Sequence, residues 1–141
     1  MVIDGLAGSA SSVLFLRFPG RGRLLRYPGG LALHSLNVFH RLQALVAAGL
    51  VDFIAMDVKA PWAKYGTLTG LAESPSDKVR ETMSVIVESG LPHQFRTTRV
   101  TPLLTDDDYA EIERQIPAGS PFKWQTFIPD NALDPALRSA T

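Results

Sequence analysis

Helix and strand patterns alternate between residues 37 and 127, and this alternation constrains the fold more than any other feature of the sequence. Three stretches have apolar residues spaced along one helix face: Val38, Leu42, Leu45 and Val46, then Val79, Met83, Ile86 and Val87, then Tyr109, Ile112 and Ile116. Strand-like runs follow them at residues 51–56, 94–100 and 122–127. This order is typical of βα units that share a parallel sheet, so we predict an α/β fold.

Residues typical of helix ends support these boundaries. Ser35 or Asn37 is a candidate N-cap for the first helix, and Gly49 lies where its C-terminal glycine is expected. Gly90 is expected to end the second helix in the same way. Thr105 and Asp108 have the spacing of a capping box at the start of the third helix. We therefore expect three helices with defined ends.

The remaining segments have weaker patterns. Residues 12–17 resemble a short buried strand, and residues 60–70 are expected to form a loop with aromatic and glycine residues. Residues 128–141 are expected to be a tail. The predicted organisation is an irregular segment at residues 1–36, the α/β unit at residues 37–135 and a tail at residues 136–141.

The charge is unevenly distributed, although the net charge is zero. Residues 1–50 contain five Arg, one Asp, no Lys, no Glu and seven of the eleven glycines. A basic block of this kind can bind nucleic acid, but this one lacks interleaved aromatic residues and lysines. We interpret residues 17–30 as an irregular basic surface loop and expect no nucleic-acid partner.

Composition excludes several further classes. The chain has no cysteine, which removes disulfides, thiolate metal ligands and a cysteine nucleophile. The first residues lack a basic stretch before an apolar run, and no run is long enough to span a bilayer. We expect no membrane partner and a cytoplasmic location.

Two charged residues end the apolar run at residues 51–56. Asp57 and Lys59 are two residues apart, so in a strand their side chains project to the same side. The carboxyl end of a parallel strand faces the crevice where α/β folds bind ligands. Two interpretations are open: the pair binds a polar or zwitterionic ligand, or it is a solvated pair at a strand end.

Polar residues on the two later strands are further candidates. Arg96 and Thr98 share one face of the next strand, and an inward arginine needs an acidic partner such as Asp57 or a ligand carboxylate. The alternative is an arginine that points to water. Gln125 and Asn131 flank the end of the last strand, where they either bind a ligand or form a turn.

Four segments in order carry a family resemblance. They are Gly-Leu-Val-Asp-Phe-Ile-Ala-Met-Asp-Val-Lys-Ala-Pro at residues 49–61, Lys-Tyr and Thr-Gly at residues 64–70, Phe-Arg-Thr-Thr at residues 95–98, and Trp-Gln-Thr-Phe-Ile-Pro-Asp-Asn-Ala-Leu-Asp-Pro at residues 124–135. Together they resemble the C-terminal half of radical S-adenosylmethionine proteins. The nearest likeness is to the glycyl-radical activases of anaerobic ribonucleoside-triphosphate reductase.

The resemblance implies an incomplete (β/α) barrel of the radical S-adenosylmethionine type, with mostly parallel strands. It also implies S-adenosylmethionine and a [4Fe–4S] cluster as cofactors, and an anaerobic ribonucleotide reductase as the partner. The positions that correspond to cofactor-binding residues of the family are Asp57, Lys59, Arg96 and Asn131.

The chain departs from this family at its defining motif. The family has three clustered cysteines after the first strand, whereas the strand-like residues 12–17 are followed by Phe-Pro-Gly-Arg-Gly-Arg. Such clusters need thiolate ligands, so we expect a truncated or degenerate form without radical activity. The alternatives are a non-catalytic α/β module that binds a nucleoside cofactor or a protein partner, and an unrelated small α/β domain.

The sharp onset of the resemblance suggests a hypothesis about residues 1–36. Together with the charge split, it suggests that this segment comes from a truncated, rearranged or frame-shifted gene. Translation of the upstream DNA in all frames tests the hypothesis. The absence of both a cysteine motif and a Gly-Gly-Glu-Pro segment from every frame would contradict it.

Overall fold

The computed structural model describes residues 14–20, 22, 25–26, 36–69, 76–101, 103–131 and 135–138, and the structural statements below concern these residues. The strands are β1 (Leu14–Arg17), β2 (Leu25–Arg26), β3 (Phe53–Asp57), β4 (His93–Arg99) and β5 (Phe122–Thr126). The helices are α1 (Leu36–Ala47), α2 (Tyr65–Thr69), α3 (Ser76–Glu88), α4 (Asp106–Gln115) and α5 (Pro135–Arg138). Two 3-10 turns, η2 (Trp62–Lys64) and η3 (Pro129–Asn131), complete the described elements.

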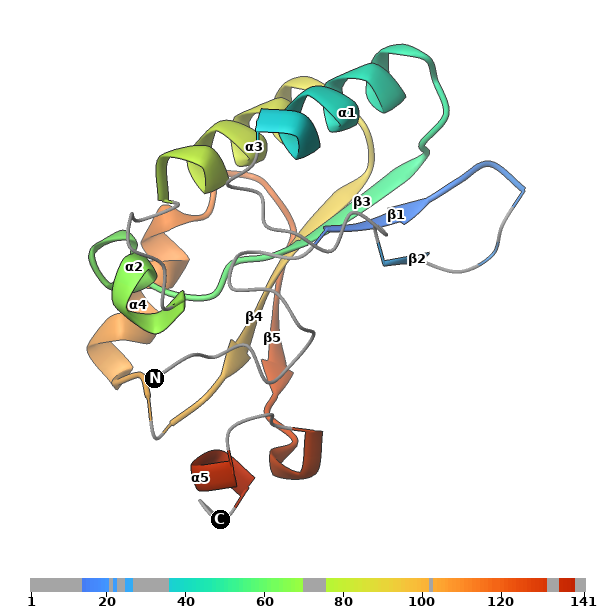
Figure 1. The fold of residues 1–141 in the computed structure, drawn as a ribbon. Helices are drawn as coiled ribbons and strands as arrows, with labels where there is room; N and C mark the ends of the chain where they lie inside the picture. The colour runs from blue at the N-terminus through green and yellow to red at the C-terminus, as the bar shows by residue number, and fades with distance from the viewer. Residues whose placement is uncertain are drawn as a thin grey trace.

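The five strands form one open sheet in the order β2-β1-β3-β4-β5 (Figure 1). The pairs β3–β4 and β4–β5 are parallel, which confirms the α/β fold and the parallel pairing predicted from residue 37 onward. The pairs β1–β2 and β1–β3 are antiparallel. The sheet is therefore mixed, and the expectation of a mostly parallel sheet is wrong for its N-terminal part.

The antiparallel pairing of β1 with β2 follows from the short connection between these two strands. Residues 18–24 separate these two strands, whereas a parallel crossover needs a dozen or more residues. β1 confirms the strand predicted at residues 12–17, and Leu16 is buried in the main core. β2 falls inside the block that we interpreted as an irregular loop, so part of that block belongs to the sheet.

The main helices cover one face of the sheet (Figure 1). One apolar core joins the sheet to three helices, through Leu42 of α1, Val79, Met83 and Ile86 of α3, and Tyr109 and Ile112 of α4. The fully buried strand residues of this core are Leu16, Ile54, Met56 and Phe95. The apolar stripes read from the sequence are thus confirmed in part: Val87, the last residue of the α3 stripe, is 38% exposed, and the side chain of Val38 lies outside the described residues.

The predicted helix ends are confirmed where the structure describes them. Gly49 and Gly90 have φ of +67° and +68°, in the left-handed region that favours glycine after a helix. Thr105 and Asp108 form the expected capping box of α4. The candidate cap at Ser35 lies outside the described residues, as does the side chain of Asn37.

Two segments that we expected to be irregular contain short helices. In the predicted loop at residues 60–70, η2 and α2 form because Tyr65 and Leu68, one helical turn apart, are both buried. In the predicted tail, α5 forms where Leu137, only 4% exposed, packs with Val100. Both short helices bury apolar side chains against residues that are distant in sequence, and local sequence patterns do not report such contacts.

Candidate functional site

A ladder of polar side chains crosses the face of the sheet opposite the helices. Phe95 and Thr97 of β4 are fully buried on the helix-covered side, so Arg96 and Thr98 project from the other side. We call that side the open face. Its registered neighbours belong to the same face: Asp57 lies beside Arg96, and Gln125 lies beside Thr98.

Asp57 and Arg96 form an ion pair at the centre of the ladder. Arg96 Nε and a terminal guanidinium nitrogen lie 2.9 Å and 2.7 Å from Asp57 Oδ1. The side chains are 13% exposed for Arg96 and 20% exposed for Asp57. The prediction that Arg96 meets Asp57 is confirmed, and both contacts engage the same carboxylate oxygen.

The second polar contact of the ladder joins β4 to β5. Thr98 Oγ1 donates to Gln125 Oε1 over 3.4 Å, a long and therefore weak hydrogen bond. Gln125 was predicted as a ligand-binding candidate, and the structure brings it to the same face as Asp57 and Arg96. The backbone of Asn131 lies in η3 after β5, and its side chain falls outside the described residues.

Lys59 lies just past the end of β3. The alternation continues there, because Val58 is fully buried and its N–H donates to Arg96 O at 2.8 Å, whereas Lys59 is half-buried. The Lys59 backbone N–H donates to the hydroxyl of the buried Tyr65 at 3.0 Å. The first residues after β3 are therefore held by contacts from β4 and α2.

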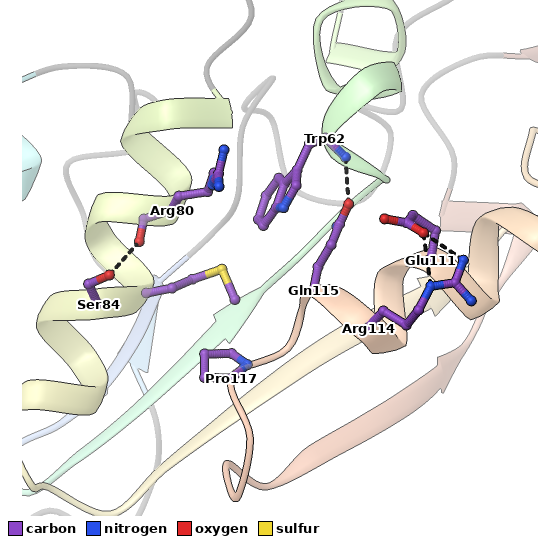
Figure 2. A pocket seen from close by; sticks show the side chains of 8 residues that line it. Trp62, Arg80, Ser84, Glu111, Arg114, Gln115 and Pro117 are labelled. Atoms are coloured by element: carbon purple, nitrogen blue, oxygen red, sulfur yellow. Dashed lines mark hydrogen bonds and ion pairs between the residues drawn. The ribbon is translucent and has the colours of Figure 1, made fainter.

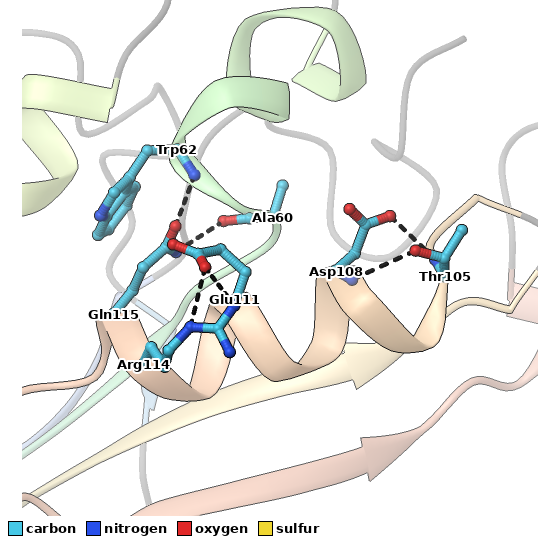
Figure 3. Close-up of polar contacts among 7 residues, drawn as sticks. All are labelled: Ala60, Trp62, Thr105, Asp108, Glu111, Arg114 and Gln115. Carbon is cyan, nitrogen blue, oxygen red and sulfur yellow. Dashed lines mark hydrogen bonds and ion pairs between the residues drawn. The ribbon is translucent and has the colours of Figure 1, made fainter.

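Gln115 of α4 fixes the next part of this connection (Figure 3). Its amide nitrogen donates to Ala60 O at 3.3 Å, and its amide oxygen accepts from the backbone N–H of Trp62 at 2.7 Å. Sequence reasoning missed this residue. The available signal was weak: Gln115 lies three residues after Ile112, at the border of the apolar stripe of α4.

Asp108 ties the end of this connection to the start of α4. Lys64 Nζ lies 2.7 Å from Asp108 Oδ2, and the same oxygen accepts from the Thr105 N–H at 2.9 Å. The hydrogen bond from Lys64 and then that from the Thr105 backbone lower the pKa of Asp108 below its ordinary value. The sequence predicted the cap but not the lysine.

The residues present do not fit an iron–sulfur cluster or another clustered metal site. The chain has no cysteine, and the part of it that the structure describes has no group of three or more His, Cys, Asp or Glu side chains able to bind a metal. His93 contacts Leu91 O at 2.8 Å and Ser120 Oγ at 2.9 Å through its two ring nitrogens. Asp106 and Asp107 belong to the first turn of α4.

The donor set of the open face does fit a zwitterionic ligand. Asp57 can accept from an ammonium group, and Arg96 can donate to a carboxylate. Thr98 and Gln125 add a hydroxyl and an amide, which can bind sugar hydroxyls or ring nitrogens. The described residues of the open face therefore offer charged and hydrogen-bonding groups for binding.

Two general findings complete the description. No helix in the described ranges has the length and apolar character needed to cross a membrane. Comparisons with protein-family models, with curated proteins and with solved structures found no match for this chain.

Proposed function

We propose that this chain is a degenerate relative of the radical S-adenosylmethionine activases of anaerobic ribonucleotide reductase, and that it binds S-adenosylmethionine without cleaving it. On this proposal β3, β4 and β5 are the remaining strands of an incomplete (β/α) barrel, with the open face as its inner side. The observation that carries the proposal is the Asp57–Arg96 pair on that face, where two neighbouring parallel strands approach their carboxyl ends.

The chemistry of the ligand matches these residues. The methionine part of S-adenosylmethionine carries an ammonium and a carboxylate, which Asp57 and Arg96 can bind in a charge-assisted way. Asp57 accepts both guanidinium contacts through Oδ1, so a ligand ammonium can approach Oδ2. Lys59 adds a positive charge near the ligand, and Asn131 is the remaining position that the resemblance implies.

The missing cysteines decide what the chain does not do on this proposal. A [4Fe–4S] cluster would supply the electron that cleaves S-adenosylmethionine, and this chain has no thiolate to hold one. We therefore propose a binding role, with an anaerobic ribonucleotide reductase as the protein partner. No radical step is assigned to this chain.

Isothermal titration calorimetry with S-adenosylmethionine tests the proposal. We expect saturable binding that weakens about tenfold in Asp57→Asn, because a charge-assisted hydrogen bond contributes about 1.5 kcal/mol. Asp52→Asn is the matched control, since Asp52 also pairs with an arginine of the sheet, Arg17, at 2.8 Å, but at the other end of β3. We expect this control to bind like the unaltered chain.

Two results would contradict the proposal. Equal affinities for Asp57→Asn and Asp52→Asn would show that the open face is not the binding site. The lack of any saturable heat signal with S-adenosylmethionine, from protein that circular dichroism shows to be folded, would exclude S-adenosylmethionine as the ligand. Anaerobic reconstitution with iron and sulfide is expected to give no cluster absorbance, and a stable cluster would overturn the non-catalytic assignment.

A further inference from the structure

A groove of about 420 Å³ lies between α3 and α4, on the helix-covered side of the sheet (Figure 2). Arg80 comes from α3, Arg114 and Gln115 come from α4, and Trp62 lies between the two helices. The Asp57–Arg96 pair projects from the opposite face of the sheet. The groove is therefore a different site from the one proposed for S-adenosylmethionine.

Two of the groups in this groove have unused hydrogen-bond donors. The guanidinium carbon of Arg80 lies 5.7 Å from the centre of the Trp62 ring, which is a cation–π distance. Among the described residues, neither the Arg80 guanidinium nor the Trp62 indole N–H has a hydrogen-bond acceptor. These N–H groups are available to bind an acceptor from outside the chain.

The charges of the lining favour a single negative charge. Arg114 is bound to Glu111, with a guanidinium nitrogen 2.6 Å from the carboxylate oxygen Oε2, so these two charges neutralise each other. Arg80 has no acidic partner in the described part of the chain, which leaves a net charge of +1 on the lining. A dianion would place its second charge near Glu111.

The rest of the lining is mixed, with the polar residues Ser84 and Gln115 and a small apolar part. Met83 and Pro117 line it beside the indole of Trp62. The hydrogen bond from the backbone N–H of Trp62 to Gln115 Oε1, at 2.7 Å, fixes the start of η2 relative to α4. A ligand would therefore meet an aromatic wall whose backbone is already held in place, which lowers the entropy lost on binding.

We infer that this groove binds a monocarboxylate carried on a flat apolar body, with the carboxylate at Arg80 and the body against Trp62. Such a group can come from a free aromatic acid or from the carboxyl terminus of a peptide that ends in an aromatic residue. Benzoate is the probe for the first source, and N-acetylphenylalanine is the probe for the second. The volume of the groove is within the range of small-molecule sites.

Nuclear magnetic resonance of the full ¹⁵N-labelled chain tests this inference at constant ionic strength. The chain has two tryptophans, so it gives two indole N–H signals, which Trp124→Phe assigns. We expect the Trp62 signal to shift saturably with benzoate or N-acetylphenylalanine. The Trp124 signal is the internal reference, because its N–H is already bound to Glu113 at 2.9 Å.

Variants and neutral analogues give the specificity. Arg80→Gln is expected to weaken binding about fivefold, as is typical for the loss of a charge contact near a protein surface. Arg41→Gln, which removes an exposed arginine of α1, is expected to leave the affinity unchanged. Benzyl alcohol should give no saturable shift, and phthalate should bind more weakly than benzoate.

Each outcome decides the inference. Tighter binding of N-acetylphenylalanine than of benzoate supports the peptide source, and the reverse order supports the free acid. The inference is overturned if neither acid shifts the Trp62 signal, if benzyl alcohol shifts it as strongly as benzoate, or if Arg80→Gln binds like the unaltered chain. Benzoate binding does not involve Asp57, so this test is independent of the S-adenosylmethionine experiment.

Discussion

The two faces of the central strand β4 differ sharply in chemistry, although their residues alternate along the same seven-residue strand. On the helix-covered face, Phe95 and Thr97 are fully buried, and Phe95 belongs to the main core. On the open face, Arg96 and Thr98 are partly exposed and bond to polar groups of the neighbouring strands. One face is a packed core, and the other carries the polar residues of the proposed binding site.

This difference assigns separate physical roles to the two faces. Removal of apolar side chains from the covered face creates cavities and raises the cost of folding. Changes on the open face alter hydrogen bonds that water can partly replace, so they should affect ligand binding more than stability. Two pairs of substitutions in β4 test this difference between the faces, beginning with the largest effect. A third prediction concerns the polar contact of Asp108 at the edge of the covered side.

Phe95→Ala is expected to have the largest effect on stability. Phe95 has no exposed surface, contacts His93 edge-on with ring centres 5.5 Å apart, and belongs to the main core. We expect the free energy of unfolding in urea to fall by about 3–5 kcal/mol, because the cavity adds to the lost apolar burial. Gln94→Ala, one residue away on the open face, should change it by less than about 0.5 kcal/mol.

Comparable losses for Phe95→Ala and Gln94→Ala would contradict the distinction between the faces. If Phe95→Ala does not fold, Phe95→Leu gives a smaller change in the same direction, because it keeps most of the buried volume. The measurement then remains a comparison of folded proteins.

The adjacent threonines of β4 give a closer comparison. Thr97 Oγ1 donates to Val58 O at 2.7 Å in a fully buried contact, whereas Thr98 Oγ1 makes the 3.4 Å contact with Gln125 on the open face. Thr97→Val should lower the free energy of unfolding by about 1–2 kcal/mol, because Val58 O loses a buried donor. Thr98→Val should change it by less than about 0.5 kcal/mol.

The measurement is again urea unfolding, with valine chosen because it has nearly the same shape as threonine. Equal effects of the two substitutions would show that the hydroxyl on the open face contributes as much to stability as the buried hydroxyl of Thr97. The same pair of variants sharpens the proposed site, since Thr98→Val should alter S-adenosylmethionine binding and Thr97→Val should not alter it directly.

Much of the fold could be predicted because its elements have strong local signals. The stripe of α3 and the capping box of α4 fixed two helices, and strand periodicity placed Asp57 and Arg96 near each other. The antiparallel direction of β1 could not be predicted, because strand direction depends on pairing between distant segments. The burial of Leu137 depends on contacts with Val100 and was missed for the same reason.

The candidate site was predicted in part. Asp57, Arg96 and Gln125 carried a signal because each lies at or near a strand end with polar side chains in register. Gln115 carried only a weak signal, its place at the border of the apolar stripe of α4, and Lys64 carried no signal for its contact. A glutamine on a helix and a lysine in a loop are ordinary surface residues until the fold brings them to Ala60 and Asp108. Supporting contacts between distant residues are set by tertiary structure.

Substitution of Asp108 is expected to have the smallest effect on the free energy of unfolding. It tests whether a polar contact at the edge of the covered side contributes to stability. The pKa of Asp108 is lowered by Lys64 and by Thr105, so its contribution is complete above about pH 5 and is lost as the pH falls through the ordinary value of 3.8 toward the lowered value. We expect Asp108→Asn to reduce the free energy of unfolding by about 1 kcal/mol at pH 7 and by less at acidic pH.

Lys64→Met should reduce the pH dependence without abolishing it, because the hydrogen bond from the Thr105 N–H remains. Urea unfolding at several pH values measures both, and a constant difference between Asp108→Asn and the unaltered chain from pH 7 to pH 3 would mean that the carboxylate charge does not stabilise this contact.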